Sequence, residues 1–282
     1  MSPTDPFRLP EGPVQIAFSG GRSSAFMLHQ LLTANNGLPD RVRVIFTNTG
    51  REMPQTLDFV AECGARWGVD IVWLEYRYED APMAVRVDYA SASRKGEPFA
   101  ALIRRKRHLP NPAARFCTAE LKVRTAKRWL VAQGWQHWVS ALGIRADEPR
   151  RLNTAPDRQR WTTWYPLAAA GVSRHDVARF WAARPFDLAL PNLNGRCWLG
   201  NCDGCFLKSE ADLAALARDY PERHRWWEEM EALAARLSNR PEGARFRKEY
   251  SRAGLRDFVD RQGDWIFETE GALCQASGGE CL

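Results

Sequence analysis

Two of the seven cysteines, Cys202 and Cys205, have the C-x-x-C spacing of a metal-binding pair. A short turn can aim both sulfurs at one point, and Gly200 and Gly204 suit such a turn. Structural disulfides are rare in the cytoplasm, where we expect this protein, and seven is an odd number of cysteines. The pattern therefore indicates metal binding, and it leaves an iron–sulfur cluster, a structural zinc and free thiols as alternatives.

A second chemical signal is the stretch Ser19–Ser24, SGGRSS, which we call the glycine loop. It follows an apolar run that ends at Phe18 and precedes a run of helix-forming residues. N–H groups at a helix N-terminus attract anions, and glycines let the backbone approach a phosphate without a Cβ in the way. The spacing is neither that of a Walker-type loop nor a dinucleotide fingerprint. On its residues alone, the stretch is either a phosphate site or a tight strand-to-helix turn.

Predicted strands and helices alternate through the first part of the chain. We expect strands at 14–18, 41–47, 70–75 and 138–142 and helices at 24–34, 54–67 and 121–133. This alternation predicts an α/β fold with a doubly wound, mostly parallel sheet. The charged segment 86–115 has little periodicity, so we predict a long loop or lid there.

The pattern changes after about residue 170, where helices are predicted at 173–181 and 210–236 without a strong strand. We therefore predict an α/β domain at 1–170, which carries the glycine loop, and a helical C-terminal region at 171–282. The second part carries the C-x-x-C and a flexible, glycine-containing tail with Cys281.

Three candidate stretches each follow a predicted strand. Because the carboxyl ends of parallel strands meet at one edge, and ligands bind there in such folds, we expect these stretches to form one site. The helical C-terminal region should bring the C-x-x-C over the same edge. The three stretches are Ser19–Ser24, Asn48–Gly50 and Gly143–Arg145.

The composition and charge of the chain indicate which kinds of partner it can have. No run approaches the ~20 apolar residues of a membrane span, and the N-terminus lacks the apolar core of a signal peptide, so we expect a cytoplasmic protein without a membrane partner. A net charge of +6 favours an anionic ligand. Twelve Lys and Arg residues lie between 86 and 128, a density that suits nucleic-acid contacts but also an ordinary solvated face.

Several stretches in order along the chain resemble one protein family. The glycine loop is similar to the pyrophosphate-binding loop (PP-loop) of the adenine nucleotide alpha-hydrolase-like superfamily. Three further stretches resemble its phosphoadenosine phosphosulfate reductase-like family, and GNCDGCFLKS (200–209) stands where iron–sulfur members carry C-x-x-C. The resemblance implies the superfamily's α/β fold and an adenine nucleotide as ligand, either ATP or an adenylylated sulfur compound. The three stretches are VIFTNTGREMPQTLDFV (44–60), RFCTAELKVRTAKRWL (115–130) and ALGIRADEPRR (141–151).

The resemblance also implies roles for single residues. Basic side chains that would meet an anionic substrate are Arg115, Lys122 and Arg151. The tail thiol Cys281 resembles the cysteine with which reductases attack sulfur, and it would be the catalytic residue. The nucleotide would be held by Ser19, Gly20, Gly21, Arg22, Ser23, Ser24, Asn48, Thr49, Gly50, Gly143 and Arg145.

Cluster ligands follow from the same resemblance. Cys117 would join Cys202 and Cys205, with Cys274 as the fourth ligand of a 4Fe–4S cluster, and zinc is the alternative metal. Cys197, Cys281 or an open iron could replace Cys274. The chain departs from both reductase classes, because cluster-containing members have adjacent cysteines where this chain has Phe116-Cys117, and cluster-free members need no C-x-x-C.

The expected function is nucleotide-dependent sulfur chemistry similar to sulfonucleotide reduction. The protein would then be an oxidoreductase, and a thiol reductant protein would supply its electrons. One alternative is an ATP-dependent sulfurtransferase that acts on a nucleic acid. Another is a non-catalytic nucleotide-binding protein associated with nucleic acid, which would use the basic segment 86–128.

Overall fold

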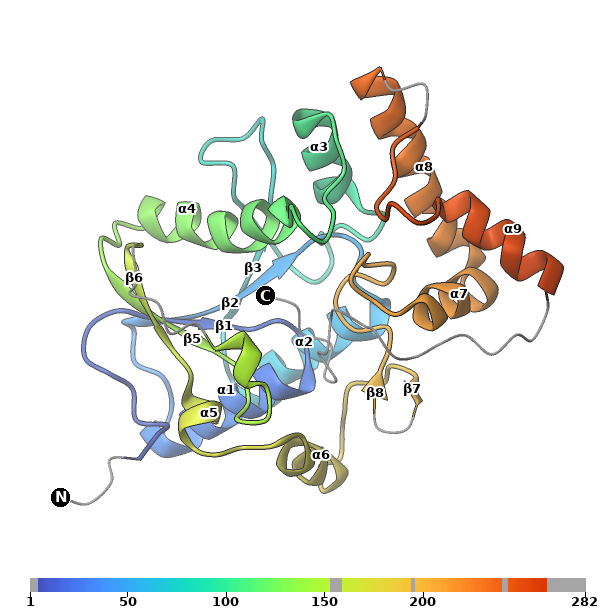
Figure 1. Cartoon of the computed structure of the whole chain (residues 1–282). Helices are drawn as coiled ribbons and strands as arrows, with labels where there is room; N and C mark the ends of the chain where they lie inside the picture. The colour runs from blue at the N-terminus through green and yellow to red at the C-terminus, as the bar shows by residue number, and fades with distance from the viewer. Residues whose placement is uncertain (1–4, 153–158, 194–195, 240–242, 263–282) are drawn as a thin grey trace.

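A six-stranded sheet occupies the centre of the computed structural model, which describes residues 5–152, 159–193, 196–239 and 243–262 (Figure 1). The strand order in space is β4-β3-β2-β1-β5-β6, and all neighbours are parallel except β3 and β4. This arrangement confirms the predicted mostly parallel sheet. The strands are β1 (Val14–Ala17), β2 (Val42–Asn48), β3 (Ile71–Glu75), β4 (Val85–Val87), β5 (Trp138–Leu142) and β6 (Trp161–Trp164).

The strand order reverses at β1, which pairs with β2 on one side and with β5 on the other. Ala17 is in register with Ile45 of β2 and with Leu142 of β5, so the loops after these strands leave the sheet side by side. Such a switch point opens a crevice at the carboxyl edge of the sheet.

Helices cover both faces of the sheet. The helices α1 (Arg22–Asn35) and α2 (Pro54–Trp67) lie on one face, while the π-helix η1 (Thr118–Arg124) continues into α4 (Thr125–Ala132) on the other (Figure 1). The boundaries of α2 match the prediction, since Pro54 suits the first helical turn and Gly68 ends the helix with a left-handed φ of 63°.

The helical C-terminal region is confirmed, with one correction. The segment 210–236 is not one helix, because the chain leaves helical geometry at Tyr220 and Pro221, which has no N–H to donate, starts a new helix. The short hairpin β7 (Asn192–Leu193) and β8 (Arg196–Cys197) precedes these helices. The helices of this region are α5 (Pro166–Ala169), α6 (Arg174–Ala182), α7 (Glu210–Asp219), α8 (Pro221–Ser238) and α9 (Arg252–Gln262).

The prediction of a long loop over 86–115 is wrong. The segment contains the end of β4 and the helix α3 (Glu97–Lys106). A short 3-10 helix, η2 (Pro149–Arg151), lies outside this segment, between β5 and β6. The apolar side of α3 is formed by Phe99, Leu102 and Ile103, which are buried at helical spacing, and the helix packs against α8. Ten residues with three basic side chains in the last turn are too short and too charged to display a clear period.

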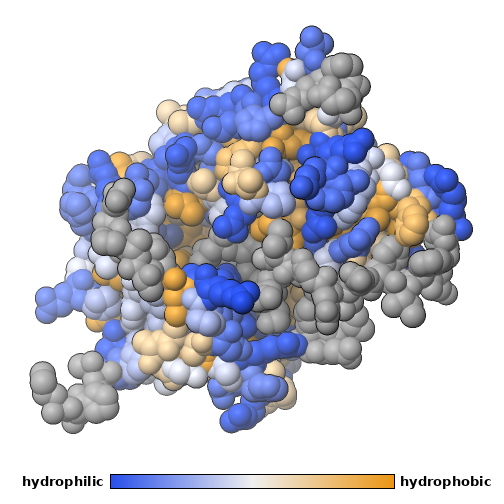
Figure 2. Space-filling model, viewed as in Figure 1, coloured by the Kyte–Doolittle hydropathy of each residue, from blue (hydrophilic) through white to orange (hydrophobic). Residues whose placement is uncertain are grey.

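The main hydrophobic core runs from the α1 and α2 side of the sheet into the C-terminal region, where Trp181 and Trp227 are almost completely buried. A second, smaller core lies between the sheet and α4. Figure 2 shows hydrophilic residues over most of the outer surface in this view. Within the described ranges, no helix is long and apolar enough to cross a membrane.

Candidate functional site

The glycine loop joins β1 to the N-terminus of α1. Gly20 has a φ of 78°, and a Cβ there would lie 2.8 Å from Cγ2 of Thr56, so only glycine fits this close approach to α2. Gly21 is the N-cap of α1, and among the described residues no side chain caps this helix end. Because a helix cannot satisfy its own first N–H groups, this N-terminus is suited to an anion.

Two serine hydroxyls close the loop on itself. The Oγ atoms of Ser19 and Ser24 lie 2.9 Å apart, and the Ser24 hydroxyl also donates to the carbonyl of Gly21 at 3.0 Å. These hydrogen bonds fix the shape of the loop. Because Gly21 is a glycine, no side chain from this position covers the N-terminus of α1.

The loop after β5 packs directly against the glycine loop. A Cβ on Gly143 would lie 3.0 Å from the Cα of Ser24, so the two backbones are in contact. Arg145 is buried, and its guanidinium donates to Oγ of Ser23 at 2.9 Å and to Oδ1 of Asp147 at 2.9 Å. In this structure Arg145 therefore holds the two loops together, at the shared edge that the sequence predicts.

A cavity of about 150 Å³ lies beside the glycine loop, between the sheet and the η1–α4 segment. Its walls include Ala17, Ile45 and Trp161, and Ser24 lies at its glycine-loop end. Ala17 is only half-buried, whereas its β1 neighbour Ile16 on the opposite face is fully buried. A largely apolar space next to an uncapped helix N-terminus suits a base attached to phosphates.

The side chain of Lys122 links this cavity to the C-x-x-C. Lys122 lines the cavity, and its Nζ donates to Oδ1 of Asn201 at 3.2 Å. Asn201 belongs to the segment 200–209, which we call the thiol loop. A cation therefore stands between this cavity and the two cysteines of that loop.

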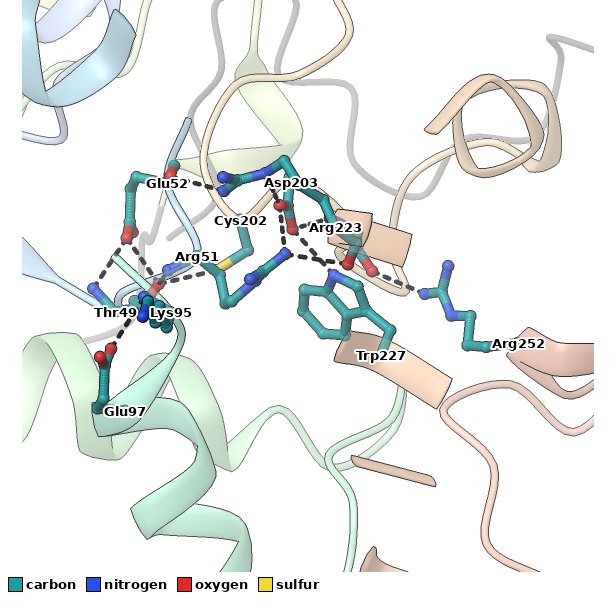
Figure 3. Close-up of polar contacts among 11 residues, drawn as sticks. Thr49, Arg51, Glu52, Lys95, Glu97, Cys202, Asp203, Arg223, Trp227 and Arg252 are labelled. Carbon is teal, nitrogen blue, oxygen red and sulfur yellow. Dashed lines mark hydrogen bonds and ion pairs between the residues drawn. The ribbon is translucent and has the colours of Figure 1, made fainter. Parts of the chain in front are cut away.

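The thiol loop reaches the carboxyl end of β2, as predicted. Oγ1 of Thr49 lies 3.3 Å from Sγ of Cys202 and donates to the buried carboxylate of Glu52 at 2.8 Å (Figure 3). Burial raises the pKa of the Cys202 thiol well above its usual value, and the carboxylate of Glu52 raises it further. The end of the second strand thus contacts a sulfur that lies 153 residues away in the sequence.

Asp203 is the centre of a buried ion network that anchors the thiol loop. Its Oδ2 accepts from Arg51 at 2.6 Å and from Arg223, and its Oδ1 accepts from Nε1 of Trp227 at 2.9 Å (Figure 3). The loop lies so close to α8 that a Cβ on Gly204 would be 2.2 Å from Nε1 of Trp227. The network ties the C-terminal helices to the edge of the sheet.

Further basic side chains hold the carbonyl groups of the thiol loop. Lys208 donates to the carbonyl of Gly200 at 2.9 Å, Arg247 to that of Phe206 at 2.8 Å, and Arg252 to that of Gly204 at 2.7 Å. Arg252 has no exposed surface, and its Nε and Nη1 are buried with no hydrogen-bond partner among the described residues. Arg247 and Arg252 belong to no local motif, so the sequence does not predict their contacts with this loop.

The glycine loop, the cavity and Lys122 all lie in a part of the chain that matches a known protein family. The model of the phosphoadenosine phosphosulfate reductase domain matches residues 13–169, which is more than half of the chain. The chain belongs to this family. The match covers the sheet, the glycine loop, the cavity and Lys122, and it confirms the family predicted from the sequence stretches.

This phosphoadenosine phosphosulfate reductase-domain protein is also similar to individual proteins. It is 28% identical over 212 residues to the uncharacterized nin region protein ORF290 of Escherichia phage lambda, which covers 72% of this chain and 69% of the relative. A crystal structure of phosphoadenylyl-sulfate (PAPS) reductase from Candida auris in a phosphate complex aligns with a TM-score of 0.41 and 18% identity. That alignment covers 66% of this chain and 81% of the other.

The predicted metal ligands are only partly within the described structure. Burial raises the pKa of Cys117, at the start of η1, to about 11, and Cys205 adds to the rise as it also does for Cys202. These three thiols therefore share one region, whose unpartnered cationic donors suit an anionic cluster. In the described ranges, however, no three His, Cys, Asp or Glu side chains are arranged to hold a metal ion. Cys274 and Cys281 lie outside these ranges.

Three of the predicted anion-binding arginines face other partners or solvent. Arg22 makes a two-point ion pair with Asp187, at 2.7 Å and 2.5 Å. Arg151 donates to Glu148 at 2.5 Å, and Arg115 is exposed. Their roles toward a ligand stay predictions. Asn48, which is predicted to contact the nucleotide, donates to the buried carboxylate of Glu75 at 2.7 Å. Its side chain therefore fixes the start of the loop that follows β2.

Proposed function

We propose that this protein binds an adenine nucleotide and uses it in sulfur chemistry of the kind that sulfonucleotide reductases perform. The observation that carries the proposal is the largely apolar cavity that runs from Trp161 to the glycine loop. The base would lie between the sheet and η1–α4, and the phosphates would lie at the N-terminus of α1. Lys122 would meet the negative charge at the end that faces the thiol loop.

The proposed reaction uses a thiolate as nucleophile. A thiolate attacks the sulfonate sulfur, the bond between that sulfur and the phosphate oxygen breaks, and the nucleotide leaves with the oxygen and its negative charge. We propose Cys281, outside the described residues, as that thiol. A second thiol, from a reductant protein, would then form a disulfide with Cys281 and release sulfite.

Filling the cavity tests the proposal. Ala17→Leu adds side-chain atoms where the base would lie, and we expect about tenfold to hundredfold weaker nucleotide binding. Calorimetry with ATP, adenylyl sulfate and phosphoadenylyl sulfate measures this change. Ala132→Leu, the same substitution at the exposed end of α4, is the control and should bind like the unmodified protein. Equal affinities of the two variants for every ligand would rule out this cavity.

A second candidate function is ATP-dependent sulfur transfer to a nucleic acid. The observation that favours it is the position of Lys122, which connects the cavity to Asn201 of the thiol loop. In that reaction ATP would adenylate an oxygen of the nucleic acid and release pyrophosphate. Hydrosulfide would then attack the carbon that bears this oxygen, and AMP would leave with the oxygen. Release of AMP only when a nucleic acid is present would favour transfer, and release of sulfite from a sulfonucleotide would favour reduction.

We also propose that Cys117, Cys202 and Cys205 hold a 4Fe–4S cluster, with Cys274 as fourth ligand and zinc as the alternative metal. The chemistry of the donors supports this, since Arg252 presents unpartnered N–H groups in the same region. A bound cluster would supply electron-transfer or sulfur-binding capacity at the end of the cavity.

The ligand set predicts the iron content of single variants. In anaerobically purified protein, Cys117→Ser, Cys202→Ser and Cys205→Ser should each lose most of the iron and sulfide, because every lost thiolate opens the cluster. Cys63→Ser is the control, since Cys63 is buried in α2 among apolar residues. Full iron in Cys117→Ser would refute the shared site, whereas zinc without sulfide in all samples would establish the alternative metal.

A further inference from the structure

One segment of the chain carries almost exclusively positive charge. Between residues 98 and 134, which include most of α3 and all of η1 and α4, Glu120 is the single acidic residue. Figure 2 shows hydrophilic residues toward the top and upper left of the view, where α3 and α4 lie in Figure 1. The same segment contains Arg104, Arg105, Lys106, Arg107, Arg115, Lys122, Arg124, Lys127 and Arg128.

The single carboxylate gathers cations from both helices. Glu120 is buried, and its oxygens lie 2.6 Å from Arg124, 2.9 Å from Arg128 and 3.6 Å from Lys106 of α3. One carboxylate neutralises one of these three charges. A net positive field therefore remains where α3 meets η1, and the exposed Arg105 adds to it.

Aromatic rings lie beneath two of the cations. Nζ of Lys127 is 5.7 Å from the ring centre of Trp161, and Nζ of Lys106 is 6.0 Å from that of Phe116. Both rings are half-buried, and Trp161 also lines the cavity beside the glycine loop. Cations interleaved with aromatic rings are the combination that binds unpaired nucleotides, through phosphate contacts and base stacking.

We infer that this surface binds single-stranded nucleic acid. We call it the basic face and define it by Arg105, Lys106, Arg124, Lys127 and Arg128. A membrane surface fits it less well, because Val123 is the one residue of α3, η1 and α4 among the exposed large apolar side chains of the described residues, and interfacial binding needs a buried apolar stripe. The strand would pass beside Trp161, at the wall of the cavity. The inference rests on the basic face alone. A single strand bound there would be the macromolecular substrate that the second candidate function requires.

Charge reversal at two exposed positions tests this inference. The variant carries Arg105→Glu and Arg124→Glu, and the control carries Arg66→Glu on α2, on the opposite face of the sheet. Fluorescence anisotropy with a labelled mixed-sequence single strand of roughly 20 nucleotides measures affinity over a salt series. We expect at least about tenfold weaker binding by the double variant and a salt dependence reduced by about two ion equivalents. The Arg66→Glu control should bind like the unmodified protein.

The outcomes separate this inference from nucleotide binding in the cavity. Calorimetry with ATP on the same double variant should give unchanged affinity, because neither arginine lines the cavity. If the double variant does not fold, Arg105→Gln with Arg124→Gln takes its place. Equal binding by the double variant and the Arg66→Glu control would overturn the inference. So would preferential binding of phosphatidylserine vesicles or polyglutamate by the unmodified protein.

Discussion

Replacing Gly21 by valine should abolish adenine-nucleotide binding and leave the protein folded. Gly21 has a φ of −99°, which any residue adopts, so valine introduces no backbone strain. Its side chain would instead stand at the N-terminus of α1, where the phosphates are proposed to lie. We expect at least about a hundredfold loss of affinity, or roughly 2.7 kcal/mol, for ATP and both sulfonucleotides, measured by calorimetry.

The choice of position makes this result interpretable. Gly20→Ala would be a poor probe, because Gly20 has a positive φ and its new Cβ would clash with Thr56. Gly254→Val is the matched control, since Gly254 is exposed on α9. Thermal unfolding shows whether each variant is folded. Unchanged affinity of Gly21→Val for all three nucleotides would remove the glycine loop from the proposed site.

Replacing Asp203 by asparagine should destabilise the protein by about 3–5 kcal/mol, because it leaves buried cations without their counter-charge. Asp203 has no exposed surface, and the Arg51 side chain paired with it is only 4% exposed. Burial lowers the pKa of the Arg51 guanidinium, and Asp203 partly offsets this effect. Asparagine keeps the shape of the side chain, so the change mainly removes charge. Denaturant unfolding under reducing conditions measures the free energy of unfolding.

The control for this prediction is an exposed ion pair. Asp219→Asn breaks the surface contact between Asp219 and Arg218 and should change the free energy of unfolding by less than about 1 kcal/mol. A similarly small effect of Asp203→Asn would mean that the buried network does not hold the thiol loop in place. Iron content measured on both variants then reports whether the loop's position matters for metal binding.

Sequence patterns determined the parts of this protein that depend on near neighbours in the chain. The helix at 54–67 was predictable to the residue, since Pro54 and Gly68 mark its ends and apolar residues recur at helical spacing. The glycine loop and the two loops at Asn48–Gly50 and Gly143–Arg145 follow apolar strands, and parallel strands bring such loops to one edge. The short, charged helix α3 was missed, although the Tyr220-Pro221 break could have been read from the proline.

Only the tertiary structure decided how the C-terminal region meets this edge. Asp203 contacts Arg51 across 152 residues, and Arg252 reaches the carbonyl of Gly204 from a helix 48 residues later. No local pattern encodes such pairs, because they depend on how distant helices pack. The same holds for the cavity. Ala17 reads in sequence as one more apolar strand residue, and its half-exposed state depends on the space that α4 leaves above the sheet.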